Sequence, residues 1–178
     1  MKEKRTGRLA LAGVFTALAV VFLLFTISPM ATVGLAALAG VCGIPVVVEW
    51  GRKAGLLHFA AVAVLALLII PTLEGKGMYI SFFGWYTVFK GFIEGKNLSR
   101  AVEWAMKIGA FLVAVTAYGA VWVWLLDMPL HEPFTLWMFP VAAVVLTAVF
   151  VVYDVGLSRL VGIYCSSIGP KLRQTFRF

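Results

Sequence analysis

Apolar residues are arranged along this chain in six long runs that are separated by short polar gaps. The runs are 16 to 26 residues long, and the longest polar stretch is the C-terminal segment. Because hydrocarbon offers no water to backbone amides, runs of this length are most simply satisfied as membrane-spanning helices. The expected helices cover residues 9–27, 32–48, 54–70, 78–93, 101–126 and 134–155. We therefore predict one all-α transmembrane domain of six helices, in which residues 156–178 form a cytoplasmic or interfacial tail.

The overall composition agrees with this interpretation. Hydrophobic residues make up 62% of the chain, charged residues make up 13%, and the mean hydropathy is +1.00. Soluble domains carry roughly 25% charged residues. A water-soluble globular protein is therefore excluded.

The positive charge lies in alternate gaps between the apolar runs. Basic residues precede the first run and follow the second, fourth and sixth runs, whereas the other gaps hold few of them. These residues are Lys2, Lys4, Arg5, Arg8, Arg52, Lys53, Lys96, Arg100, Arg159, Lys171, Arg173 and Arg177. Because loops rich in lysine and arginine stay in the cytoplasm, both termini are expected inside. The net charge of +7 thus reflects membrane topology and not nucleic-acid binding.

Proline and small residues give further detail about the second and third expected helices. Pro45 is expected to kink the inner end of the second helix, and Pro71 to end the third. A strip of small residues on the second helix allows close backbone approach. The strip consists of Ala36, Ala39, Gly40 and Gly43. His58 is expected to be a polar residue within the helix packing.

The fourth apolar run is unusually short. Its uncharged part, residues 78–89, covers roughly 18 Å at 1.5 Å per residue, whereas the hydrocarbon core is about 30 Å thick. Lys90 must therefore lie below the membrane surface, extend toward it, or be sheltered by protein.

Four charged residues are expected to meet at the inner ends of the fourth and fifth helices. Lys90 and Glu94 are four residues apart, and Glu103 and Lys107 repeat this spacing in reverse order. Because a short turn joins the two helices, Lys90 can meet Glu103, and Glu94 can meet Lys107. Three roles are open for this cluster. Its charges either neutralise one another and so stabilise the structure, or form a docking or gating element for a cytoplasmic partner, or act as a proton relay.

Aromatic residues gather in two places. Tyr79, Tyr118, Trp122, Trp124 and Trp137 lie toward the outside, where an interfacial aromatic belt is common. Phe82, Phe83, Trp85 and Tyr86 lie in the middle of the fourth helix. These residues either pack in the core or flank a cavity beside Gly84, where their rings would stack on a flat ligand. Polar contacts at its mouth would come from Glu74, Asp127, His131 and Glu132.

Enzyme motifs are missing from the sequence. It contains no nucleophile elbow, no zinc-protease motif and no glycine-rich phosphate loop with its lysine. His58 and His131 are expected on opposite sides of the membrane and cannot share one metal ion. We therefore expect no catalytic activity, no cofactor and no resident metal.

The first helix carries a family resemblance. Its sequence Leu-Ala-Leu-Ala-Gly-Val-Phe-Thr-Ala-Leu-Ala, residues 9–19, follows a basic start. It resembles the first helix of the substrate-binding S components of energy-coupling factor transporters. In that family a small-x-x-x-small pattern packs against the transmembrane coupling subunit, and the matching positions here are Gly13 and Ala17, with Ala10 one turn earlier. Gly13 replaces the usual first alanine, and Thr16 replaces the alternative second one.

The resemblance implies a six-helix protein of a bacterial cell membrane with both ends inside. Such a protein captures a vitamin-like molecule or metal ion from outside and relies on a shared ATPase module. The implied ligand-binding residues are Tyr79, Trp85, Tyr86, Trp122 and His131, whereas the ligand itself is not assigned.

Two other functions stay open at this point. One is a membrane scaffold similar in bulk to the small membrane subunit of the rod-shape machinery. The other is a small membrane enzyme acting on a lipid, for which Glu94 and Glu103 are the only candidate catalytic pair.

Overall fold

The chain is built from helices that run between two ends of the molecule. The computed structural model describes residues 2–96, 98–126 and 133–176, with side chains for residues 7–28, 30–96, 98–125 and 140–172. In these ranges it contains no strand. The elements are α1 (Lys2–Leu24), η1 (Phe25–Ile27), η2 (Pro29–Ala31), α2 (Thr32–Val41), α3 (Gly43–Ile69), α4 (Leu73–Met78), η3 (Tyr79–Phe83), α5 (Gly84–Glu94), α6 (Arg100–Leu126), α7 (Pro133–Ile163), η4 (Tyr164–Ile168) and α8 (Gly169–Phe176).

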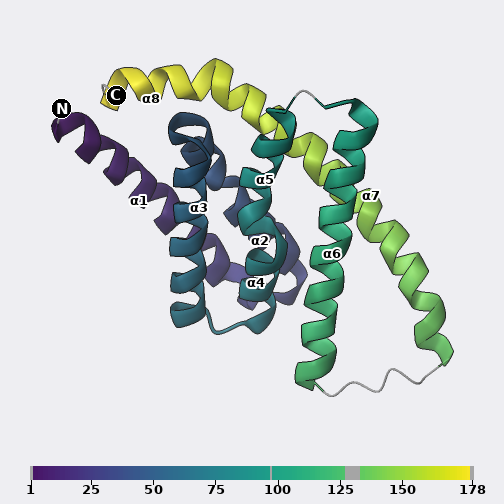
Figure 1. The fold of residues 1–178 in the computed structure, drawn as a ribbon. Coiled ribbons are helices and arrows are strands. Elements are labelled where there is room, and N and C mark those ends of the chain that lie inside the picture. Colours follow the sequence, from purple (N-terminus) through teal and green to yellow (C-terminus); the bar gives the residue numbers. More distant parts are fainter. Residues whose placement is uncertain (1, 97, 127–132, 177–178) are drawn as a thin grey trace.

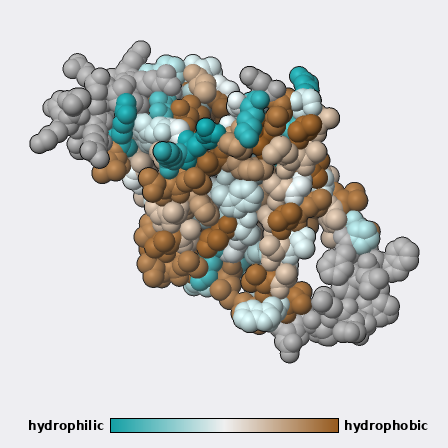
Figure 2. Space-filling model, viewed as in Figure 1, coloured by the Kyte–Doolittle hydropathy of each residue, from teal (hydrophilic) through white to brown (hydrophobic). Residues whose placement is uncertain are grey.

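Both chain termini lie at the same end of the molecule, as does the connection between α5 and α6 (Figure 1). We call this the inner end and the opposite end the outer end, following the orientation that the charge pattern predicts. Hydrophilic residues gather at the inner end, and hydrophobic residues cover the middle of the visible surface (Figure 2).

Four helices among the described residues are long and apolar enough to cross a membrane. They are Gly7–Ile27, Gly43–Ile69, Arg100–Leu125 and Pro140–Leu172, and Thr32–Val41 is a shorter apolar helix. The predicted all-α class is therefore confirmed, together with helices of the length and composition that a membrane protein needs. Six crossings stay a prediction.

Two breaks divide the region predicted as the second and third helices. The first break is at Cys42, because Pro45 lacks the amide hydrogen that would bond to the carbonyl of Val41. The second is at Gly51 inside α3, where φ is 81° and ψ is −178°. Only glycine adopts this φ at low cost. A Cβ atom placed on Gly55 would touch the Val47 side chain, so the chain reverses direction at Gly51.

The fourth predicted helix begins earlier than the expected residue 78. The helix starts at Leu73, directly after Pro71 and the extended Thr72 (φ −78°, ψ 119°), and continues through α4, η3 and α5 to Glu94. At 1.5 Å per residue this rod is about 33 Å long. The helical rod is therefore longer than its uncharged part, residues 78–89, because the polar residues of α4 are helical as well.

The last helix is longer than predicted. It does not end at residue 155 but extends to Ile163 and continues through the π-helical turn η4 into α8. At the inner end, the hydroxyl of Tyr164 donates a hydrogen bond to Oε1 of Glu49 over 3.2 Å. This contact holds the predicted tail segment against α3.

The core consists of two clusters. In the first, the small residues Ala36, Ala39 and Gly40 of α2 are buried against α1, α3 and η3. A Cβ atom on Gly40 would lie 2.5 Å from the carbonyl oxygen of Phe83, so this position accepts only glycine without movement of the backbone. The second cluster is aromatic and joins η3 and α5 to α6 and α7.

Candidate functional site

A network of charged side chains joins α5, α6 and α7 near the inner end. On α5, Nζ of Lys90 lies 2.6 Å from Oδ1 of Asp154 and 2.7 Å from Oε1 of Glu94. The Lys90 side chain is almost fully buried. Of the three environments expected for this lysine, the structure shows shelter by protein.

Lys107 is the second cation of the network. Its Nζ lies 2.7 Å from Oε1 of Glu94, 2.7 Å from Oε1 of Glu103 and 3.3 Å from Oδ2 of Asp154. The predicted contact between Glu94 and Lys107 is therefore present. The other predicted contact was between Lys90 and Glu103. In the structure Lys90 pairs with Asp154 of α7 and not with Glu103.

Asp154 connects the network to the aromatic core. Its Oδ1 atom accepts hydrogen bonds from the Lys90 ammonium and, over 2.6 Å, from the hydroxyl of Tyr86. Its Oδ2 atom faces Lys107. A buried carboxylate is stable only when paired and hydrogen-bonded, and both oxygens meet this requirement.

Asp154 was not predicted as a member of the cluster, because it lies at the end of the last expected helix, residues 134–155. A signal was present in the sequence. Leu157 and Val161 follow it three and seven residues later, at helical spacing, so the acid interrupts an apolar helix and does not end it. An ionisable residue inside an apolar helix calls for a partner on a neighbouring helix.

The members of the network differ in their exposure to solvent. The side chains of Lys90, Lys107 and Asp154 are at most 3% exposed, whereas those of Glu94 and Glu103 are 40% and 25% exposed. With two lysines and three carboxylates, the formal charge is −1 when all are ionised. Exposure of the two glutamates lets water screen the excess negative charge.

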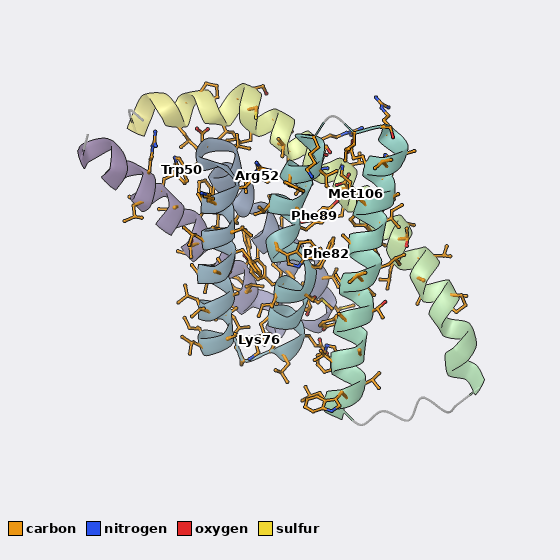
Figure 3. All side chains as sticks on the ribbon, viewed as in Figure 1. Trp50, Arg52, Lys76, Phe82, Phe89 and Met106 are labelled. Carbon is orange, nitrogen blue, oxygen red and sulfur yellow. The ribbon has the colours of Figure 1, made fainter. Side chains whose placement is uncertain are left out.

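The outer half of the same helices contains a cavity of about 300 Å³ between α4, η3 and α6. Tyr118 and Trp122 of α6 form one wall, with their ring centroids 6.0 Å apart in an edge-to-face arrangement. Ser81 and Lys76 lie on the opposite wall. The Lys76 ammonium donates a hydrogen bond to the carbonyl of Ile70 over 3.1 Å, which holds it at the outer end (Figure 3).

A second cavity of about 250 Å³ lies next to the first and shares Ser81 and Tyr118 with it. Phe82 and Phe111 form its floor on the side of the aromatic core. Leu146 of α7 also contributes to its lining. Both cavities are largely apolar and could hold an apolar or aromatic group.

Among the predicted ligand-binding residues, the structure places Trp122 in a described cavity. Tyr79 and Tyr86 are fully buried in the core and line none of these cavities. The indole of Trp85 packs on Phe82 and Phe89 and donates a hydrogen bond to the carbonyl of Ser81 over 2.7 Å. Core packing, one of the two alternatives for the middle aromatic group, therefore describes these residues.

The ligand-binding roles of Tyr79, Trp85 and Tyr86 stay predictions, and His131 lies outside the described residues. Sequence reasoning assigned Tyr118 to an aromatic belt and did not single out Ser81 or Lys76. Only the packing of α4 and η3 against α6 brings these three side chains into one cavity.

The predicted partner-contact residues lie together on an open face of α1. Ala10, Gly13 and Ala17 are all exposed, and a Cβ atom on Gly13 would touch nothing within 4 Å. Their contact with a coupling subunit stays a prediction.

The candidate site thus has a buried ionic network at the inner end and aromatic-lined cavities at the outer end of the same helices. The network holds helices together, and the cavities offer stacking surfaces to a small molecule. No family model, curated protein or solved structure matches this chain.

Proposed function

We propose that the protein is the substrate-binding subunit of an energy-coupling-factor-type transporter that takes up a vitamin or similar micronutrient. The observation that carries this proposal is the aromatic-lined cavity of about 300 Å³ in the outer halves of η3 and α6. At the inner end, the ion pair of Lys107 with Glu94 joins α6 to α5, and the buried ion pair of Lys107 with Asp154 joins α6 to α7. A scavenging protein needs a site in its outer half whose inner side is closed.

The lining of the cavity indicates the chemical class of the ligand. Tyr118 and Trp122 offer ring faces and edges to a flat, largely apolar molecule. The Lys76 ammonium at the outer end can bind a carboxylate or phosphate of that molecule. The cavity volume lies at the lower end of the range for small-molecule sites.

The proposed topology has six crossings with both termini in the cytoplasm. Four helices qualify as spans by length and composition. The remaining two crossings are α2 together with the first part of α3, and the rod formed by α4, η3 and α5. This rod carries Glu74 and Lys76 at its outer end, and these charged residues make it less hydrophobic than the four helices that qualify as spans.

Energy for transport would come from separate subunits. The sequence contains no glycine-rich phosphate loop that could bind ATP. The exposed small residues Ala10, Gly13 and Ala17 allow close approach of a helix from a transmembrane coupling subunit. The ionic network lies at the end where cytoplasmic ATPases would approach.

The test is ligand binding by the purified protein. Small molecules that copurify from the native membrane are identified by mass spectrometry, and a panel of vitamins is titrated against the protein. Trp122→Ala and Tyr118→Ala should each weaken binding by about 1 to 3 kcal/mol because a stacking surface is lost. Trp124→Ala is the matched control, because Trp124 is 82% exposed and lines none of the described cavities. The proposal fails if no ligand binds saturably or if Trp124→Ala weakens binding equally.

A membrane scaffold is the second candidate function. The open small-residue face of α1 favours it as well, because such a face suits a helix of any membrane partner. A scaffold would copurify with cell-envelope proteins in stable amounts, and Trp122→Ala would leave that association unchanged.

A further inference from the structure

A groove of about 610 Å³ runs along the outside of the helix pair formed by α1 and α3. It shares no lining residue with the outer cavities. Its walls are mainly aliphatic and its lining includes Gly13, Ala17, Leu57, Ala61 and Leu65. Gly13, Ala17, Leu57 and Ala61 are exposed, so the groove opens sideways toward the lipid.

The groove has the length of one membrane leaflet. Its α1 wall extends from Arg8 to Ala17, and its α3 wall from Ala54 to Leu65. At 1.5 Å per residue these walls are about 14 Å and 17 Å long. A leaflet contributes about 15 Å to a hydrocarbon core of about 30 Å. Arg8 is near the inner end of α1, so the groove reaches from the inner interface to the middle of the membrane.

The chemistry of the groove is that of an amphiphile site. At the inner end, Arg8 is exposed and supplies a cation, and Trp50 supplies an indole of the kind that settles at membrane interfaces (Figure 3). Deeper in, Nδ1 of His58 and Oγ1 of Thr16 lie 3.0 Å apart. The Thr16 hydroxyl also donates to the carbonyl of Ala12, so it is the His58 ring that donates to Thr16. These groups bond to each other and leave the interior of the groove apolar.

We propose that the groove between α1 and α3 binds an anionic phospholipid of the inner leaflet, with the phosphate at Arg8 and an acyl chain along Gly13, Ala17 and Ala61. The positive charge lies only at the inner end of the groove and the apolar wall covers the rest, which matches a charged headgroup on a hydrocarbon chain. Lys53, which is exposed near the same end, adds to the positive potential. The inference concerns the subunit by itself, when no coupling subunit covers Gly13 and Ala17, and does not depend on which molecule is transported.

The experiment is native mass spectrometry of the purified protein after exchange into a mixture of phosphatidylglycerol and phosphatidylcholine. One retained phosphatidylglycerol per protein is expected. Arg8→Gln should lower its retention roughly fivefold, which is the effect of one interfacial cation. Ala61→Trp should abolish retention, because the indole fills the groove.

Two control variants separate specific binding from general lipid association. Arg100→Gln removes an exposed cation at the inner end of α6, away from the groove. Val144→Trp adds an indole to the lipid-facing side of α7, at a residue that is 72% exposed. Both controls should retain the lipid as the unmodified protein does, and thermal unfolding of every variant checks that it is folded.

Three results would overturn the inference. One is equal retention of the two lipids, and another is undiminished retention by a folded Ala61→Trp variant. The third is an efficient disulfide between two copies of a Gly13→Cys variant in lipid nanodiscs without retained phosphatidylglycerol, which would assign the groove to a second copy of this chain.

Discussion

The rod formed by α4, η3 and α5 contacts α6 and α7 at both ends of the molecule, but the two ends are held together differently. At the inner end, Lys90, Lys107 and Asp154 bring charges from three helices into a dry interior. At the outer end the contacts are apolar, cavities remain, and α6 and α7 diverge (Figure 1). Directional ion pairs fix one end, whereas non-directional packing leaves the other end able to adapt to a ligand.

The difference between the two ends concerns what holds apolar helices together. Lipid supplies no hydrophobic driving force between helices, so packing and polar contacts must hold them. Between the two ends, the rings of Phe111 and Phe150 stack with centroids 4.6 Å apart and an interplanar angle of 12°. This aromatic layer separates the ionic network from the cavities.

Removal of Asp154 should have the largest effect. Asp154→Ala removes the only buried carboxylate that Lys90 and Lys107 contact among the described residues, and the free energy of unfolding should fall by about 3 to 5 kcal/mol. Asp154→Asn keeps the shape and should cost less. Thermal unfolding in detergent measures both, with Glu74→Gln at an exposed outer position as control. An Asp154→Ala protein as stable as the control would show that the network does not hold the inner end.

Truncation of a side chain in the aromatic layer should have the second largest effect on stability. Phe111→Ala removes the stack with Phe150 and leaves a void, at a cost of roughly 3 kcal/mol. Val113→Ala on the lipid-facing side of α6 is the control and should stay within about 0.5 kcal/mol. If the two substitutions cost the same, the layer does not couple the two ends.

Neutralisation of a half-exposed member of the network should have a smaller effect. Glu94→Gln removes one charge but keeps a hydrogen-bond acceptor for Lys107, and water screens this position. We expect a loss of about 1 kcal/mol, measured by chemical unfolding. Glu94→Gln combined with Glu103→Gln should cost more than the sum of the single changes, because Lys107 then loses both glutamates. Strict additivity would contradict a shared network.

The outer cavity should contribute least to stability. Trp122→Ala should change the free energy of unfolding without ligand by less than about 1 kcal/mol, although it weakens ligand binding. The reason is that Trp122 contacts Tyr118 at the edge of a cavity and is not part of the buried core. The same unfolding assay provides the measurement. A loss comparable to that of Phe111→Ala would mean that the outer end is as firmly packed as the centre.

Much of the fold could be predicted because hydrophobic length and proline positions act locally. The limits of α6 and the break near Pro45 were anticipated in this way. The early start of the fourth helix was not, because Glu74 and Lys76 look like loop residues when hydropathy alone is considered. Their helical state depends on the extended Pro71 and Thr72 before them and on packing at the outer end.

The site was predicted only in part because it depends on which helices are neighbours. The contact between Glu94 and Lys107 follows from a short connection in sequence. The pairing of Lys90 with Asp154 joins residues 64 positions apart, and no local pattern specifies it. The same holds for Tyr118 of α6 and Ser81 of η3, which lie on opposite walls of one cavity.

The π-helical turn of Tyr79–Phe83 fixes the rotational register between the two ends of one continuous rod. Residues on its outer side line the cavity, and residues on its inner side enter the ionic network. Each residue of an α-helix advances the chain by about 100°. Deletion of a single residue in α5 before Lys90 would therefore swing Lys90 through more than a quarter of a circle while leaving Lys76 in place. Chains of this architecture should tolerate changes of length in their loops far better than within the α-helical parts of this rod.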